Sequence, residues 1–154
     1  MKSKPTSQKI KRLVRDLSKN WPDKSAVSIA RKYRLNLRYL GSGIDRKAFL
    51  IRGTDIVLKL SEYRGQSSRE LKRISSIKRK TPSLRKYLPK VYRYGCRISK
   101  NGDSSVVAME YCSKRATYEE VEKIERLFKN LNDVHGNNVR KTRTGEVKII
   151  DLGY

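Results

Sequence analysis

Hydrophobic residues first recur at helical spacing, three and four positions apart, on an otherwise basic segment. They are Ile10, Leu13, Val14 and Leu17. This pattern predicts a helix with one apolar stripe that ends near Trp21-Pro22. A second helix is expected next, with Asp23 or Ser25 as its N-cap. Its apolar side would be formed by Ala26, Ile29, Ala30 and Tyr33.

After these helices the hydrophobic pattern changes to that of strands. Three short runs, at residues 37–40, 48–51 and 56–60, are separated by bends that contain glycine. Consecutive runs of this length predict antiparallel strands joined by tight turns. Residues 67–77 return to helical spacing, and a break is expected at residues 78–82, where the run ends in proline.

The second half of the chain predicts two strands, a helix and a final strand. The strands span residues 91–98 and 104–111 around a Lys-Asn-Gly-Asp turn at residues 100–103. A helix is expected at residues 117–130 and the last strand at residues 147–150. The helix would turn four side chains inward: Val121, Ile124, Leu127 and Phe128. This order of elements predicts an α+β chain in two small lobes.

The chain is short and strongly basic. Its 154 residues fit one domain, and 38 Lys and Arg against 15 Asp and Glu give a formal net charge of +23. Such a charge attracts nucleic acids, acidic proteins or anionic lipid. Because a turn separates the first two helices, one interpretation of residues 10–36 is a helix-turn-helix DNA reader. The other is that both helices pack on the domain that follows.

The absence of two kinds of sequence feature bears on the compartment in which the protein is expected. No apolar run approaches the roughly 20 residues that span a bilayer, and no signal peptide is evident. Cys96 and Cys112 are isolated, without the spacing of a metal site, so a reducing cytoplasm is expected. The sequence leaves a disulfide between these two cysteines open.

The candidate chemistry lies in residues 133–153. Asp133, His135 and Asn138 form the pattern Asp-x-His-x-x-Asn, and a short hairpin later the chain reads Ile-Ile-Asp-Leu-Gly, with the aspartate at position 151. At this spacing the two motifs resemble the catalytic loop and the metal-binding motif of the protein-kinase-like superfamily, in its atypical branch and in small bacteriophage proteins. The resemblance implies that Asp133 is the catalytic base and that Asn138 and Asp151 bind Mg²⁺. Without it, the segment would be a polar hairpin loop followed by a strand.

The segment from Gly41 through Ser42 to Gly43 resembles the start of the kinase glycine-rich loop, where backbone approaches phosphate closely. The third glycine of the family pattern is replaced by Arg46, with Lys47 beside it. The loop is therefore expected to use side-chain cations as well as backbone amides. A plain pair of turn glycines is the alternative.

Val57 and Lys59 stand in an apolar strand that resembles the one carrying the ATP-binding lysine. A lysine in such a strand needs a partner, because burying an unpaired ammonium group is costly. The resemblance implies Glu70, on the helix that follows. Glu62 is the competitor, but it lies too close along the chain to reach back easily. A solvated carboxylate on a helix face is the alternative for Glu70.

Residues 106–112 resemble the strand and hinge that line an adenine pocket. In that interpretation Met109 lies at the back of the pocket, and the backbone at Glu110 and Cys112 pairs with the purine edge. An ordinary core strand would have the same pattern.

The resemblance implies a minimal kinase-like fold, with a five-stranded antiparallel N-lobe and a strongly truncated helical C-lobe. Leu131 and Asn132 replace the His-Arg pair of eukaryotic-type protein kinases, and the sequence ends soon after Asp151. The implied segments are a basic tail (1–9), an N-terminal helical extension (10–36), the N-lobe with nucleotide pocket and hinge (37–112), and the truncated C-lobe (113–154).

The leading hypothesis is an ATP- and Mg²⁺-dependent kinase, encoded by a bacteriophage and acting in the host cytoplasm. Its acceptor would be a hydroxyl of an acidic host protein or of a small molecule. One alternative is a catalytically silent kinase-like scaffold that binds a host protein or a nucleotide. The other is a basic protein that binds nucleic acid through its N-terminal helices.

Overall fold

The computed structural model describes residues 5–43, 46–62, 64–98, 105–130, 134 and 136–152. The chain is α+β and divides into two compact units. Unit 1 comprises Met1–Ser67 and Val91–Glu110, and unit 2 comprises Ser68–Lys90 and Tyr111–Tyr154. No helix within the described ranges is long and apolar enough to cross a membrane.

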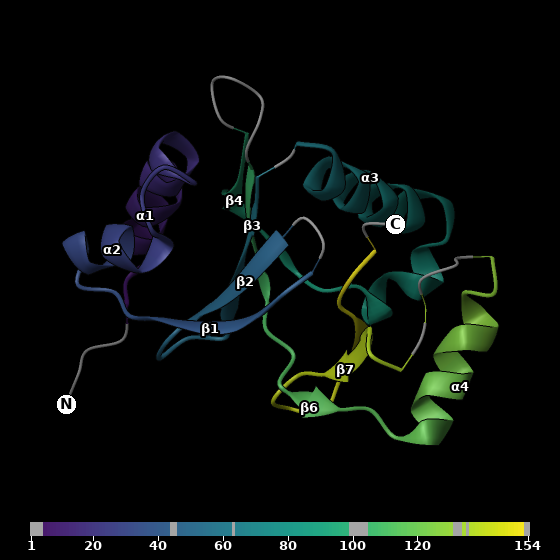
Figure 1. Ribbon diagram of the computed structural model, residues 1–154. Coiled ribbons are helices and arrows are strands. Elements are labelled where there is room, and N and C mark those ends of the chain that lie inside the picture. The colour runs from purple at the N-terminus through teal and green to yellow at the C-terminus, as the bar shows by residue number, and fades with distance from the viewer. Residues whose placement is uncertain are drawn as a thin grey trace. The chain divides into compact units, whose positions relative to one another are not determined.

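Unit 1 contains a five-stranded antiparallel sheet, as the sequence predicts (Figure 1). The order across the sheet is β1-β2-β3-β5-β4, so β5, the last of these five strands along the chain, lies inside the sheet and β4 lies at its edge. The turn expected at residues 100–103 lies outside the described residues. The strands are β1 (Leu37–Ser42), β2 (Arg46–Ile51), β3 (Ile56–Ser61), β4 (Val91–Ile98) and β5 (Ser105–Glu110).

Two helices precede the sheet, α1 (Ser7–Asn20) and α2 (Ala26–Lys32). The Thr6 side chain accepts a hydrogen bond from the backbone N–H of Lys9, so α1 begins three residues before the expected position. Ser25, and not Asp23, caps α2 by accepting from the backbone N–H of Ser28 at 3.1 Å. Local capping chemistry therefore sets both helix starts.

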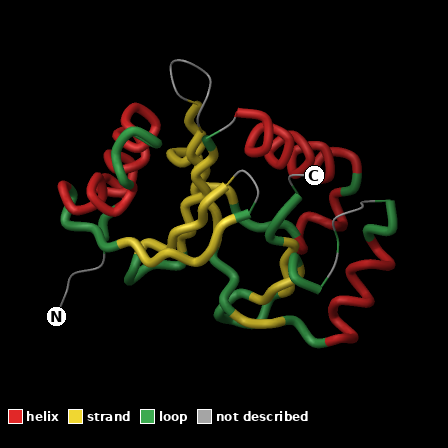
Figure 2. The backbone as a smooth tube through the Cα atoms, viewed as in Figure 1, coloured by secondary structure: helices red, strands yellow, loops and turns green. Residues whose placement is uncertain are grey.

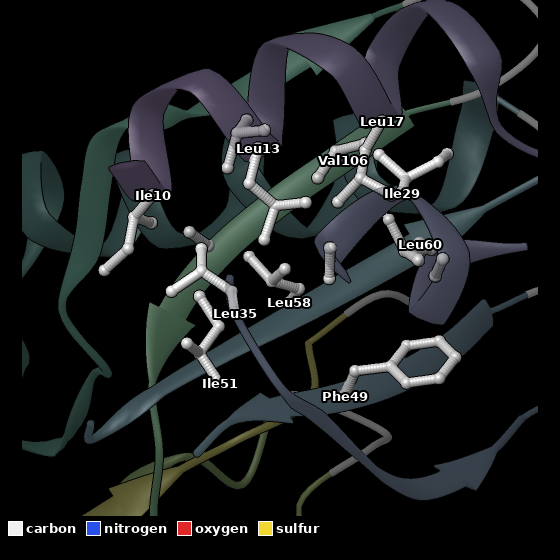
Figure 3. Packing of buried hydrophobic residues seen from close by; sticks show 14 of the residues in the cluster. Ile10, Leu13, Leu17, Ile29, Leu35, Phe49, Ile51, Leu58, Leu60 and Val106 are labelled. Atoms are coloured by element: carbon white, nitrogen blue, oxygen red, sulfur yellow. The ribbon is translucent and has the colours of Figure 1, made fainter. Parts of the chain in front are cut away.

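The two helices pack on one face of the sheet. Strand side chains alternate between faces, so every second residue of β2, β3 and β5 points toward the helices. Figure 3 shows this core between α1, α2 and the strands. Its strand members are Phe49, Ile51, Ile56, Leu58, Leu60, Val106 and Ala108, and its α1 members are Ile10, Leu13, Val14 and Leu17. Of the two interpretations of residues 10–36, packing on the following domain is the one observed.

Asp16 joins the two helices. Its carboxylate accepts a hydrogen bond from the Tyr33 hydroxyl at 2.7 Å and one from the Asn20 amide, and it lies 3.6 Å from the Lys32 ammonium. Burial raises the pKa of Asp16, but these hydrogen bonds and the Lys32 charge outweigh burial and hold the pKa below its usual value. The ionised form is thus favoured in the folded state.

Unit 2 contains a three-stranded antiparallel sheet of order β6-β7-β8 and the helices α3 and α4, which are longer than its 3₁₀ helix η1 (Figure 2). Helix α3 continues to Lys80, so the expected break at residues 78–80 is wrong, and only the proline ends the helix. That proline starts a 3₁₀ helix that the sequence did not predict. The elements are α3 (Arg64–Lys80), η1 (Pro82–Tyr87), β6 (Lys114–Arg115), α4 (Tyr118–Leu127), β7 (Val139–Lys141) and β8 (Val147–Ile149).

Helix α4 starts with a capping box. Thr117 Oγ1 accepts from the Glu120 N–H at 3.2 Å, and Glu120 Oε2 accepts from the Thr117 N–H at 2.7 Å. The helix ends at Leu127, three residues before the expected end. Leu127 is 44% exposed, so its expected inward orientation is wrong. Ile124 and Phe128 are buried as predicted.

Candidate functional site

Of the residues expected to bind nucleotide in unit 1, Val57, Lys59 and Met109 lie on the sheet face opposite α1 and α2. Strand register places Gly41 next to Ala48, Ala48 next to Lys59, and Lys59 next to Val107. Lys59 is half-buried and points to the other side of β3 from Leu58, which belongs to the helix-facing core. The glycine-rich turn and the lysine thus share one row across the sheet.

A second row on the same face pairs Val57 with Leu50 and with Met109. All three are buried, and Met109 is only 1% exposed. Glu110 ends β5 opposite Ile56. The unit 1 part of the expected adenine lining, Val57 and Met109, therefore lies beside the Lys59 row.

The β1–β2 turn carries the expected glycine-rich loop. Gly43 donates its N–H to the Arg46 carbonyl at 2.8 Å, and Ser42 is exposed. Gly41 has φ +154°, in the region that favours glycine. The two cations expected to serve this loop differ: Arg46 is 8% exposed, whereas Lys47 lies 5.4 Å from the Trp21 ring, on the helix-facing side.

Near the end of β5, Tyr92 is packed against the helix-facing core. Burial raises the pKa of the Tyr92 phenol, and the nearby carboxylates of Glu110 and Asp55 raise it further. Cys112, the other hinge residue, belongs to unit 2 and is a buried thiol, so the disulfide that the sequence left open is not formed. The predicted pairing of the Glu110 and Cys112 backbone with a purine stays a prediction.

In unit 2 the β7–β8 hairpin brings Asn138 and Asp151 to the same end. Asn138 directly precedes β7, and its carbonyl accepts a hydrogen bond from the Ile150 N–H at 2.8 Å. Asp151 is the next residue along the chain. Both candidate metal ligands are half-buried, so they retain contact with solvent. Twelve residues lie between Asn138 and Asp151 in the sequence, and the hairpin brings their backbones back together.

The hairpin is held in register from both sides. Val139 and Ile149 face each other and are fully buried. Beyond Asp151, the Leu152 side chain is fully buried and its carbonyl accepts a hydrogen bond from Arg73 Nη1 on α3 at 3.2 Å. The backbone on which Asp151 stands is therefore anchored.

The closed end of the hairpin depends on a short turn. Thr142 donates its N–H to the Glu146 carbonyl at 2.9 Å, and its hydroxyl accepts from the Glu146 N–H at 3.1 Å. Gly145 has φ +94°, which residues with a side chain rarely adopt. Glycine at this position allows the tight closure that aligns the open end.

Glu70 on α3 is 1% exposed, so it is a buried carboxylate and the solvated alternative is wrong. Lys59 belongs to unit 1 and Glu70 to unit 2, and their expected pairing stays a prediction. Asp133, His135 and Gly153 lie outside the described residues. Within the described residues, no three His, Cys, Asp or Glu side chains gather as a metal site.

The structure also shows a set of cations that the sequence analysis missed. Arg115 of β6 lies opposite Arg140 of β7, and Arg140 lies opposite Lys148 of β8. We call Arg115, Arg140 and Lys148 the cation row. Asn138 directly precedes β7 and is two residues before Arg140 in the chain. No sequence pattern revealed the cation row, since β6 is two residues long and both are exposed.

No known family model matches the sequence, and no curated protein is significantly similar to it.

Proposed function

We propose that this protein is an ATP- and Mg²⁺-dependent phosphotransferase with a minimal kinase-like fold and a short C-lobe. The observation that supports the proposal is the β7–β8 hairpin, at whose open end the Asn138 carbonyl accepts a hydrogen bond from the N–H of Ile150, the residue before Asp151. Asn138 and Asp151 belong to two separate sequence motifs. Their meeting at one anchored strand end is what a binding site for a phosphate-bound cation requires.

The donor atoms at this end fit Mg²⁺. A carboxylate and an amide oxygen are hard ligands, and Mg²⁺ usually takes one or two protein carboxylates and completes its shell with water and substrate phosphates. Asp151 supplies the charge and Asn138 a neutral oxygen. Bound there, the cation would neutralise charge on the phosphates during transfer.

The remaining roles follow the order of residues along the chain. Lys59, on the third strand, would bind the phosphates, and Glu70, on the next helix, is the carboxylate proposed to orient it. Asp133 would accept the proton of the attacking hydroxyl. The acceptor proposed for this reaction is a hydroxyl of an acidic protein or of a small molecule.

The test uses the full chain with γ-labelled ATP, in the presence of Mg²⁺ or of EDTA, alone and with bacterial lysate. We expect label transfer only with Mg²⁺, together with an ATP-dependent rise in melting temperature. A melting shift without transfer would favour the scaffold alternative. The absence of both label transfer and a melting-temperature shift would refute the proposal.

Nucleic-acid binding is the second candidate function, favoured by the outer face of α1. Lys11, Arg12, Arg15 and Lys19 are all exposed on the side opposite the buried stripe. None of the four forms a salt bridge or side-chain hydrogen bond with the described residues. Like charges four positions apart cost about 0.2–0.5 kcal/mol per pair, which an anionic partner would relieve.

The chemistry of this face favours a phosphate backbone over other anionic partners. A membrane-bound helix inserts an apolar side, but Leu13 and Leu17 are already fully buried against the sheet. A protein partner would be expected to meet apolar or aromatic anchors, which the exposed side of α1 lacks. A phosphate backbone, in contrast, can be bound by cations alone, without apolar anchors.

We expect the Lys11→Gln/Arg15→Gln/Lys19→Gln variant to bind double-stranded DNA more weakly and with a shallower dependence on salt. The slope of log K against log salt concentration should fall by about 2–3, because each phosphate contact contributes about 0.9. The matched control removes three exposed cations of α3, Arg69, Lys72 and Arg79. An equal loss in both variants would show diffuse attraction by net charge and exclude α1 as the binding face.

A further inference from the structure

The cation row concentrates positive charge on one face of the β6-β7-β8 sheet. Adjacent strands are about 4.8 Å apart, so Arg115, Arg140 and Lys148 span roughly 10 Å. Lys148 is 9% exposed, Arg140 is half-buried and Arg115 is exposed. The row therefore runs from solvent into a poorly screened environment, where charge interactions are stronger.

Like charges directly opposite each other across a strand pair are destabilising. Neither the Arg115 nor the Arg140 side chain forms a hydrogen bond or an ion pair with the described residues. On the opposite face of the same strands, Lys141 lies 3.3 Å from Glu120, whose pKa is lowered by the Thr117 backbone N–H and by Lys141. A protein carboxylate thus pairs with a cation on the opposite face, whereas no carboxylate of the described residues pairs with Arg115 or Arg140.

We propose that the cation row binds a linear polyphosphate, alone or as part of a nucleotide; the choice of this ligand rests on the proposed function. Guanidinium groups bind phosphate oxygens in a bidentate manner. The row extends over three strands, so a chain of phosphates can follow it and contact more of its cations than one phosphate ion would.

The position of the row supports phosphate over a peptide carboxylate. Asn138 directly precedes β7 and lies two residues before Arg140, so the row and this candidate metal ligand are close along the backbone. Mg²⁺ at Asn138 and Asp151 would share its shell with phosphate oxygens. The cations and the candidate metal ligands would then bind successive parts of one ligand.

The test is calorimetric titration of the full chain with inorganic tripolyphosphate in EDTA at low salt. We expect the Arg115→Gln/Arg140→Gln variant to bind about 10- to 100-fold more weakly, because charge-assisted hydrogen bonds are lost. The control, Lys114→Gln/Lys123→Gln, removes two exposed cations of unit 2 away from this face and should bind as the wild type does. Equal losses in both variants, or none in the first, would overturn the proposal.

Further titrations identify the source of the ligand. ATP binding that weakens in parallel with tripolyphosphate, while adenosine does not bind, would assign the phosphates of a nucleotide. Tripolyphosphate binding without ATP binding would assign free polyphosphate. Tighter binding of polyglutamate than of tripolyphosphate would overturn the proposal in favour of an acidic protein.

Two further variants separate this inference from the proposed function and from misfolding. Asp151→Asn should keep metal-free tripolyphosphate binding even if phosphate transfer is lost or was never present. Arg140→Lys retains the charge and should bind more tightly than Arg140→Gln. The melting temperature of the double arginine variant should not fall, since removal of facing like charges relieves repulsion.

Discussion

An Asp151→Asn variant should transfer phosphate from ATP about 10²–10³-fold more slowly than the wild type at equal Mg²⁺. The substitution keeps the shape of the side chain and removes the charge that would hold a divalent cation. The buried Leu152 and its hydrogen bond from Arg73 anchor the next residue, so the backbone should not move. Initial rates with labelled ATP over a series of Mg²⁺ concentrations measure the effect. Asn138→Ala should cost less, since it removes a neutral ligand.

The matched control for this variant is Asp23→Asn, the same chemical change at an exposed position that caps no helix. Its transfer rate and melting temperature should equal those of the wild type. A transfer rate for Asp151→Asn within about threefold of the wild type would show that Asp151 does not bind the metal, since tenfold corresponds to only 1.36 kcal/mol.

Leu58→Ala should lower the free energy of unfolding by about 3–5 kcal/mol. Leu58 is fully buried in the layer where α1 and α2 cover β3. Shortening it removes three carbon atoms and leaves a cavity that a strand paired on both sides cannot collapse easily. Chemical denaturation followed by circular dichroism measures the change.

Leu40→Ala is the control for Leu58→Ala, because Leu40 is in the same sheet but 37% exposed on its edge strand β1. It removes the same atoms and should cost less than about 1 kcal/mol. Equal losses in the two variants would contradict a core centred on the contact between the helices and the sheet.

Several elements followed from local patterns. The stripe on α1 has the helical period, and its four hydrophobic residues are all at most 2% exposed. The break expected before Pro82 was wrong because lysine and arginine are good helix formers, and only proline removes the hydrogen bond. At the end of α4, exposed Leu127 shows that a hydrophobic residue near a helix end need not face the core.

One part of the candidate site could likewise be predicted from local patterns, and another part could not. Spacing alone predicted a hairpin between Asn138 and Asp151, because the turn residues and the short strand are local. The cation row could not be predicted, since it depends on which residue of β6 lies opposite Arg140. A shift of one residue would have placed Lys114 there and turned Arg115 to the other face.

The sequence by itself determined the longer helices, the five strands of unit 1 and the basic character of the chain, because these depend on local periodicity, capping and charge; η1 and β6 were not predicted. Tertiary structure alone decided that α1 and α2 cover the sheet, that Glu70 is buried and that three cations stand in one row. These features arise from register and packing between segments far apart in the chain, and no local pattern encodes the free energy of those contacts.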